Sequence, residues 1–414
     1  MMDARTLKAR AIVAGGRIHT ANGFYFIPSQ TGRGFHRVSL GGLFPTCTCD
    51  DHELTQGECK HIIAARLWGE EQRTSPAPVD PPAPVKRKTY PQDWPNYNKA
   101  QNREKGHFQH LLADLCRSIP EPAPKGGSKG GRPTVPMKDA AFLACFKVYC
   151  GFSARRFMCD VADAHDRGHV SKPVCHNSVL KALENPALTP VLLDLIRRSA
   201  APLAAVEEDF AVDSSGFCTN SYTRWFDVKY GEKTLQKWVK PHIVTGVRTN
   251  CVAAVEIHEM RTHDCNVLPS LVEATAKTFT VREVSADKAY TATANFEAVE
   301  KVGGTLYAAF KNNTTGEVGG IYGRMYHLFC LNRSEYLTRY HKRSNVESTF
   351  SAVKRKFGEM VRSRTDTAQR NEVLCKFVCQ NVCCLISAVY ELGLPILPDT
   401  ADDDVRIIRF PGVG

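Results

Sequence analysis

Two proline-rich segments divide this chain and limit how much of it can share one core. Residues 76–95 contain seven prolines in twenty positions, and residues 120–136 contain five prolines and four glycines. Proline lacks the backbone N–H that helix interiors and inner strands need, and such stretches form extended linkers without a core. A chain of 414 residues also exceeds one ordinary core. We therefore predict several structured units joined by loose connections.

The pattern between these breaks predicts five parts. Strand-like runs at 12–19, 23–29 and 35–41 place a small β-rich unit in residues 1–70. Residues 71–136 are predicted to be a linker with a short helical patch at 107–119, followed by four helical runs in residues 137–207. Residues 208–395 alternate strand-like runs with helices, which is typical of an α/β layer, and residues 396–414 form a tail.

Composition narrows the class of protein. The net charge of +11 favours polyanionic partners without identifying one. No apolar run approaches the roughly 18–20 residues that a membrane-spanning helix needs, and the N-terminus lacks the apolar core of a signal peptide. We expect a cytoplasmic protein with no membrane partner, whose sixteen cysteines are reduced.

Four of these cysteines share one apolar segment, and two readings of it are open. They recur at roughly four-residue spacing in EVLCKFVCQNVCCLISAVYELG: Cys375, Cys379, Cys383 and Cys384. This spacing could suggest a metal site on one helix face. Because the segment is apolar throughout and free cysteine buries readily, we favour a core helix.

Four soft ligands near the N-terminus spell C-x-C-x9-C-x-H: Cys47, Cys49, Cys59 and His61. Two close ligand pairs separated by a short loop suit one tetrahedral zinc ion, which would hold together a unit too small to rely on its core. The alternative is four residues without a metal. In the loop, Asp50, Asp51 and His52 are expected at the surface. The strands before the pattern and the helix after it resemble the SWIM zinc finger, a family implicated in binding DNA or protein.

The segment YHKRSNVESTFSAVK, residues 340–354, carries polar groups at helical spacing. At about 100° per residue, Tyr340, Arg343, Glu347 and Lys354 fall on one stripe beside an apolar stripe. Alone, this could be a surface helix with an Arg343–Glu347 pair. Residues 340–364 as a whole hold seven basic residues against two acidic ones. Basic groups crowded around a single acid suggest a phosphate backbone passing that acid.

Two-metal phosphoryl transfer needs acidic ligands that converge from strand ends and a helix. Asp213 ends one strand-like run, Asp287 ends another 74 residues later, and Glu347 lies 60 residues further on. An isolated strand-end aspartate is more often a turn or helix-cap residue, but this order with basic partners favours a joint site. For Asp264, a helix N-cap is favoured over a catalytic role.

Residues 209–364 resemble the catalytic domain of bacterial insertion-sequence DDE transposases, which have an RNase H-like fold. YHKRSNVESTFSAVK matches that group's Y-x2-R-x3-E-x6-K signature at every fixed position, and with the stretch from GGRPT onward the resemblance covers about two thirds of the chain. It implies that Asp213, Asp287 and Glu347 hold two Mg²⁺ or Mn²⁺ ions. It also implies phosphate contacts by Tyr340 and Arg343. With only 59 residues between Asp287 and Glu347, the large β-rich insertion of some relatives is not expected.

The expected architecture is therefore multidomain α/β: an RNase H-like catalytic domain, a helical, helix-turn-helix-like DNA-binding region and a small β+α SWIM zinc-finger domain. The resemblance implies a transposase that binds double-stranded DNA at the terminal inverted repeats of its element, cuts and joins strands, and works as a homodimer in the bacterial cytoplasm or nucleoid. Further DNA contacts are assigned to Lys354, Lys240, Arg355 and Lys356. Two other readings stay open: a nuclease or resolvase without strand transfer, and a DNA-binding regulator with an inactive catalytic domain.

Overall fold

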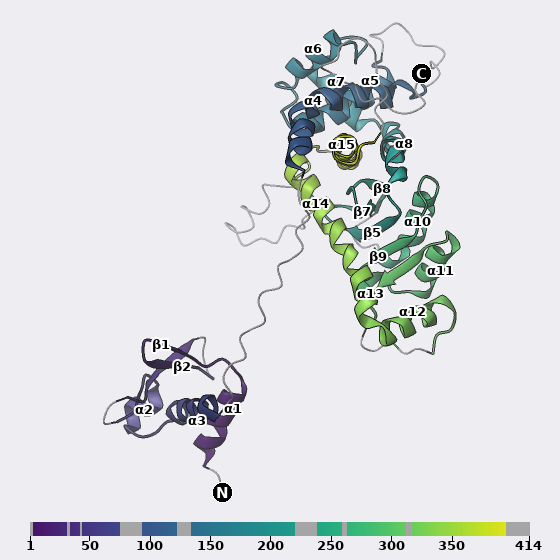
Figure 1. Cartoon of the computed structure of the whole chain (residues 1–414). Coiled ribbons are helices and arrows are strands. Elements are labelled where there is room, and N and C mark those ends of the chain that lie inside the picture. Colours follow the sequence, from purple (N-terminus) through teal and green to yellow (C-terminus); the bar gives the residue numbers. More distant parts are fainter. Residues whose placement is uncertain are drawn as a thin grey trace. The chain divides into compact units, whose positions relative to one another are not determined.

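The computed structural model forms two compact units, residues 1–91 and 92–414, shown in Figure 1. It describes residues 3–30, 34–41, 44–74, 93–121, 134–219, 238–258, 263–311, 314 and 317–394. Much of both proline-rich segments, the strand-like run at 223–232 and the predicted tail lie outside the described residues.

The N-terminal unit is a four-stranded antiparallel sheet with helices packed beside it. The strands are β1 (His19–Ala21), β2 (Phe24–Pro28), β3 (Phe35–Ser39) and β4 (Thr46–Cys47), in that order. The helices are α1 (Ala4–Ala14), α2 (Asp50–Thr55) and α3 (Lys60–Thr74). Helix α3 contacts β2 and β3, and α1 packs on α3. The strand predicted at 12–19 is wrong in its first half, because residues 12–14 end α1 and contribute Ile12 to the core.

The second unit contains a five-stranded mixed sheet in the order β8-β7-β5-β9-β10, with the short β6 also paired to β7. Its strands are β5 (Asp209–Ser214), β6 (Phe217–Cys218), β7 (Trp238–Gly246), β8 (Val252–His258), β9 (Glu283–Ala286) and β10 (Thr305–Ala308). Strands β5, β7 and β8 are antiparallel neighbours, whereas β9 and β10 run parallel to β5. This is the α/β layer that the sequence predicts.

Helices lie between and after the last strands and close the layer. They are α10 (Leu268–Ala276), α11 (Thr293–Lys301), α12 (Gly320–Leu331), α13 (Arg333–Tyr340) and α14 (Ser344–Phe357). The segment 340–354, which has helical spacing in the sequence, spans the last residue of α13, the 3-10 turn η4 (His341–Arg343) and most of α14. Helix α14 ends at Phe357 because Gly358 adopts φ +87°, a backbone conformation that favours glycine. Between Asp287 and Glu347 the described residues add only one strand, β10, as expected from the short spacing.

The helical region is not separate from the α/β layer. Its helices are α4 (Trp94–Arg117), α5 (Met137–Cys150), α6 (Met158–Asp166), α7 (His176–Glu184) and α8 (Leu188–Ala200). They surround α15 (Asp366–Leu392), which Figure 1 shows end-on among α4, α5 and α8. Helix α15 also contacts β7 and β8. The predicted boundary at 207/208 therefore runs through one shared core.

Two predictions about this region need correction or remain open. Helix α4, predicted as a short patch in a linker, is a 24-residue helix with a buried face that packs on α5 and α15. Helices α6 and α7 are joined by residues 167–175, which is longer than the three- or four-residue turn of a helix-turn-helix. A DNA-binding role for this region stays a prediction.

Helix α15 confirms the core-helix reading of the cysteine segment. Cys375, Cys379, Cys383 and Cys384 are buried and free. By length and composition this helix could cross a membrane, but 89% of its most apolar window is buried inside the protein. Its apolar character is thus explained by packing among the neighbouring helices.

Candidate active site and metal cluster

The first two predicted carboxylates lie side by side at one edge of the sheet. Strands β5 and β9 are parallel, and Val212 pairs with Ala286. Asp213 and Asp287 are the next residues along these strands, whose spacing is about 4.8 Å. Strand β5 ends one residue after Asp213, at Ser214, and Asp287 is followed by the 3-10 turn that begins at Lys288. The parallel register thus joins two residues far apart in the sequence.

The third carboxylate comes from α14, which packs on β5 and β7. Glu347 lies in its first turn, and its Oε1 is 2.6 Å from the Arg343 guanidinium. The same guanidinium is 3.6 Å from Asp213 Oδ2, so Arg343 lies between the two acids. Among the described residues, the oxygens of the three carboxylates are not all within 4.8 Å of one another. Two of them, Asp213 and Glu347, pair with Arg343 instead of contacting each other.

Electrostatics link the three acids. Burial raises the pKa of Asp213, and the charges of Asp287 and Asp264 raise it further, against a hydrogen bond from the Ser214 N–H and the Arg343 charge. Burial lowers the pKa of Arg343, but Glu347, Asp287 and Asp213 outweigh it and the pKa is raised. A concentration of carboxylate oxygens that repel one another is the donor set that hard divalent cations prefer.

Asp213 and Glu347 line one cavity of about 420 Å³ together with polar residues of α14. Lys354 enters it, donates to Ser215 Oγ at 2.9 Å and lies over the Phe217 ring. Arg355 also lines it and donates to Ser351 Oγ. Neither cation has a carboxylate partner among the described residues, so both charges are available in the cavity.

The other predicted DNA contacts lie in different surroundings. Tyr340 is partly buried, and burial raises its pKa. Lys356 forms an ion pair with Glu104 of α4. Lys342, counted in the basic run, donates at 2.7 Å to both Asp209 and Glu283. Part of the basic surplus around Glu347 is therefore neutralised inside the protein.

Asp264 occupies a place that the sequence did not reveal. Its predicted N-cap role is wrong, because His263 caps the turn η2 (Asp264–Asn266) and no side-chain cap bond forms. Its carboxylate instead forms an ion pair with Lys240 and accepts from Ser214 Oγ at 3.2 Å. Asp264 thus lies next to the residue that follows Asp213. The sequence signal was weak, because Lys240 is 24 residues away on β7.

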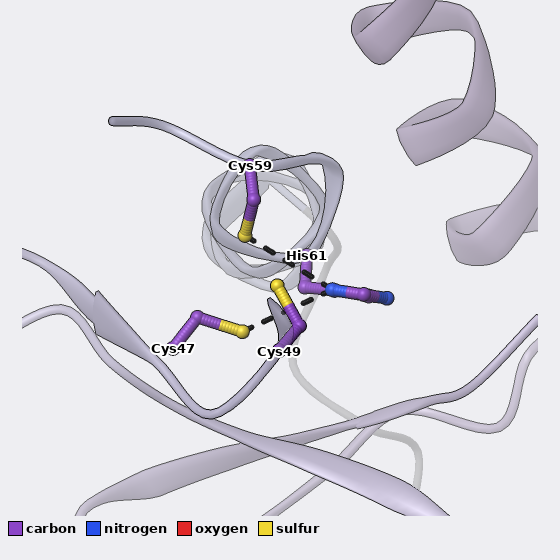
Figure 2. A group of neighbouring side chains, drawn as sticks. All are labelled: Cys47, Cys49, Cys59 and His61. Carbon is purple, nitrogen blue, oxygen red and sulfur yellow. Dashed lines mark hydrogen bonds between the residues drawn. The ribbon is translucent and has the colours of Figure 1, made fainter. Parts of the chain in front are cut away.

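The N-terminal cysteines and histidine form a buried cluster, shown in Figure 2. One ligand atom from each of Cys47, Cys49, Cys59 and His61 lies within 4.8 Å of all the others. His61 Nδ1 is 3.9 Å from Cys47 Sγ and 4.0 Å from Cys59 Sγ. A zinc ion with Zn–S bonds of about 2.3 Å and a Zn–N bond of about 2.0 Å spans such a cluster.

The chemistry of this cluster also fits a zinc ion. The contact with Cys47 lowers the pKa of the Cys59 thiol, and the contact with His61 lowers it further. Zinc binds the thiolate form. A cluster of buried sulfurs beside an imidazole therefore suggests a zinc site. His52 is not at the surface as predicted: it is 9% exposed and its Nδ1 lies 2.8 Å from the Gly57 carbonyl oxygen, which closes the ligand loop.

Among the comparisons with known proteins, a family model matches part of the second unit. A family model described as "Transposase DDE domain" matches residues 205–382, which include β5, β9 and α14. No curated protein matches the chain. Among solved structures, the chain aligns with a piggyBac transposase in a synaptic complex with hairpin DNA, determined by cryo-EM. The identity is 10% and the TM-score 0.30, over 70% of this chain and 72% of that one, which is too loose to identify corresponding residues.

Residues 205–382 are therefore a DDE transposase domain on a mixed α/β, RNase H-like fold. The activity of such a domain is that of a polynucleotidyl transferase, and such transposases use divalent metal ions. The small antiparallel sheet with its Cys/His cluster lies outside the matched region.

Proposed function

We propose that this chain is the transposase of a bacterial mobile element, acting in the cytoplasm or nucleoid on double-stranded DNA. It binds the terminal inverted repeats, cleaves the strand ends and joins them to target DNA at a site formed by Asp213, Asp287 and Glu347. The observation that supports this best is the register of β5 and β9, which brings the two aspartates together inside the matched domain.

The three carboxylates would hold two Mg²⁺ or Mn²⁺ ions. Bound there, such ions activate the attacking oxygen and stabilise the leaving oxygen of a phosphodiester. The fit rests on the donor set, since Asp213 and Glu347 pair with one guanidinium and burial destabilises the charged form of Asp213. Hard oxygen ligands of this kind suit divalent cations. Catalysis would then come from the positioning of the reacting groups and from the charge of the bound ions.

The basic residues at the cavity would place the DNA. Arg343 contacts both Glu347 and Asp213, so its guanidinium can neutralise a phosphate next to the acids. Lys354 reaches the cavity from the next turns of α14 and would hold the strand through another phosphate. Arg355, Lys240, Lys356 and Tyr340 are proposed as further contacts. Two copies of the chain would assemble on the two ends of the element.

The zinc cluster would have a structural role. One Zn²⁺ bound by Cys47, Cys49, Cys59 and His61 would join β4, the ligand loop and the start of α3. Such ions supply folding free energy directly in units with small cores.

The test is metal-dependent cleavage of an oligonucleotide duplex that carries the element's end. Asp213→Ala, Asp287→Ala and Glu347→Gln are each expected to abolish cleavage and strand transfer while duplex binding is largely kept. Glu335→Gln is the matched control, because Glu335 has the same 58% exposed side chain and the same spacing to an arginine, Arg339. Undiminished cleavage by any of the three variants would refute the site. Cleavage without any joined product would indicate a nuclease or resolvase.

A further inference from the structure

One face of the N-terminal sheet is not used by the core of its unit. Side chains alternate along a strand, so Ile27 and Val38 point to the face that α3 contacts, where both are fully buried. The alternate residues of β1, β2 and β3 point to the opposite face of the sheet, which we call the aromatic face. It consists of His19, Phe24, Phe26, Phe35 and Arg37.

The rings of the aromatic face form a connected platform. His19 stacks on Phe26 with ring centroids 5.1 Å apart and an angle of 6° between the planes. Phe35 meets His19 edge-on at 5.0 Å and is 50% exposed. Rings held rigidly by strands at an open surface offer flat faces for stacking at little entropic cost.

The charge of this face favours a polyanion. Strands β1 to β4 contain no aspartate or glutamate. The Arg37 guanidinium lies 4.9 Å from the Phe24 ring centroid and has no ion pair among the described residues. By contrast, two acids on the helical side form ion pairs: Asp51 with Arg5 and Glu58 with Arg66. The cation and the rings therefore share one face, free of competing carboxylates.

We propose that the aromatic face binds single-stranded nucleic acid. Bases would stack on the rings of Phe26, His19 and Phe35, and Arg37 would contact the phosphates. Stacking of this kind needs exposed base faces, which a duplex hides inside its own stack. This site would be separate from the triad and from any duplex contact of the second unit. An apolar protein partner would fit the rings but leave the Arg37 charge without a role.

The experiment uses the full-length, zinc-loaded chain without added magnesium and a twelve-residue oligothymidine with one 4-thiothymidine. Binding is followed by fluorescence anisotropy, and the photo-crosslinked peptide is identified by mass spectrometry. We expect crosslinks within residues 19–37. Phe35→Ala should weaken binding about tenfold, as alanine replacement of a stacking ring does. Leu54→Ala is the matched control, because Leu54 is an exposed apolar residue of the same unit, on α2, and should leave binding unchanged.

The zinc content of each variant is measured as well, and an unchanged content shows that the N-terminal unit stays folded. Crosslinks confined to the second unit would overturn the proposal, as would equal affinities for Phe35→Ala and Leu54→Ala. Absent binding of the oligonucleotide by the zinc-loaded wild type would overturn it too, and would favour a protein partner. The outcome is independent of the proposed catalysis, because Glu347→Gln should keep oligonucleotide binding and Phe35→Ala should keep metal-dependent cleavage.

Discussion

At the scale of single residues, Asp213 is held in a charge state that costs stability. Its folded pKa is above the usual 3.8, chiefly because of burial. When folding raises the pKa of an acid, ionisation of that acid lowers the free energy of unfolding. This loss is absent below the unfolded pKa and develops as the pH rises through the folded pKa. We expect a carboxylate that binds a metal ion to destabilise the fold in this way when no metal ion neutralises its charge.

We therefore expect Asp213→Asn to raise the melting temperature at pH 7 without divalent ions, by about 1–4 °C. The difference from the wild type should shrink as the pH falls toward 3.8 and below, because the Asp213 carboxyl then becomes protonated. Differential scanning calorimetry measures it. Asp194→Asn is the control, since Asp194 is exposed and paired with Arg197. A lower melting temperature for Asp213→Asn at pH 7 would contradict this explanation.

Lys354 is expected to contact the DNA backbone. Its ammonium donates to a serine and forms no ion pair with a described carboxylate, so its charge can bind a phosphate. Lys354→Ala is expected to weaken duplex binding and to lower the slope of log K against log salt by about 1. Lys301→Ala, at an exposed ion pair with Glu273, should leave the slope unchanged. An unaltered slope for Lys354→Ala would place this lysine off the DNA.

The place of a residue in the fold could be predicted from the sequence only where it depends on residues close to it in the chain. The positions of Asp213 and Asp287 at strand ends followed from patterns within a few residues. The inward pairing of Lys342 with Glu283 and the contact of Asp264 with Lys240 did not, because these partners meet only through the register of β5, β7 and β9. Charge counts along the chain cannot distinguish such buried pairs from free cations.

At the scale of elements, α15 is joined to the edge of the sheet by one side chain. Asn381 is fully buried; its Oδ1 accepts from the Val252 N–H at 2.6 Å, and its Nδ2 donates to the Val252 carbonyl at 2.8 Å. It also donates to the Ile196 carbonyl of α8 at 3.1 Å. One amide thus connects α15, β8 and α8.

Asn381→Ala should lower the free energy of unfolding by about 2–4 kcal/mol, because it leaves several buried backbone groups without partners. Chemical denaturation measures this loss. The adjacent Gln380→Ala is the control, since Gln380 makes only longer bonds, at 3.5 Å to Asn250 and 3.2 Å to Cys384. Equal losses for the two variants would show that the amide bonds of Asn381 contribute little.

The elements with strong periodicity were predicted well, and those beside proline were not. Strand β7 and helices α5 and α15 match the predicted runs to within a few residues. The first half of helix α4 was missed because its sequence is polar around Asn102 and Lys105 and prolines flank the helix, while its stability comes from packing on α5 and α15. The turn η4 was missed because the pattern around Tyr340 continues the helical stripe.

At the scale of the whole molecule, the two compact units should unfold separately. The N-terminal unit has a small core around its cysteine cluster, so its folding should depend on zinc, whereas the second unit has its own large core. We expect two calorimetric transitions, of which a zinc chelator removes only the one of residues 1–74. Cys59→Ser should act like the chelator, and Cys330→Ser, at an exposed cysteine, should not. A chelator that shifts both transitions equally would refute independent folding.

The shared core around α15 restricts how such a protein can be recombined with relatives. A chimaera cut near residue 207, at the apparent border between helices and sheet, would separate α15 from α4, α5, α7 and α8, all of which it touches. A fragment trimmed to residues 205–382 would end inside that helix and expose its apolar flank to water. Exchange between residues 74 and 93 would instead leave the core of each compact unit whole. New combinations that keep their solubility should therefore carry their crossover in that proline-rich stretch.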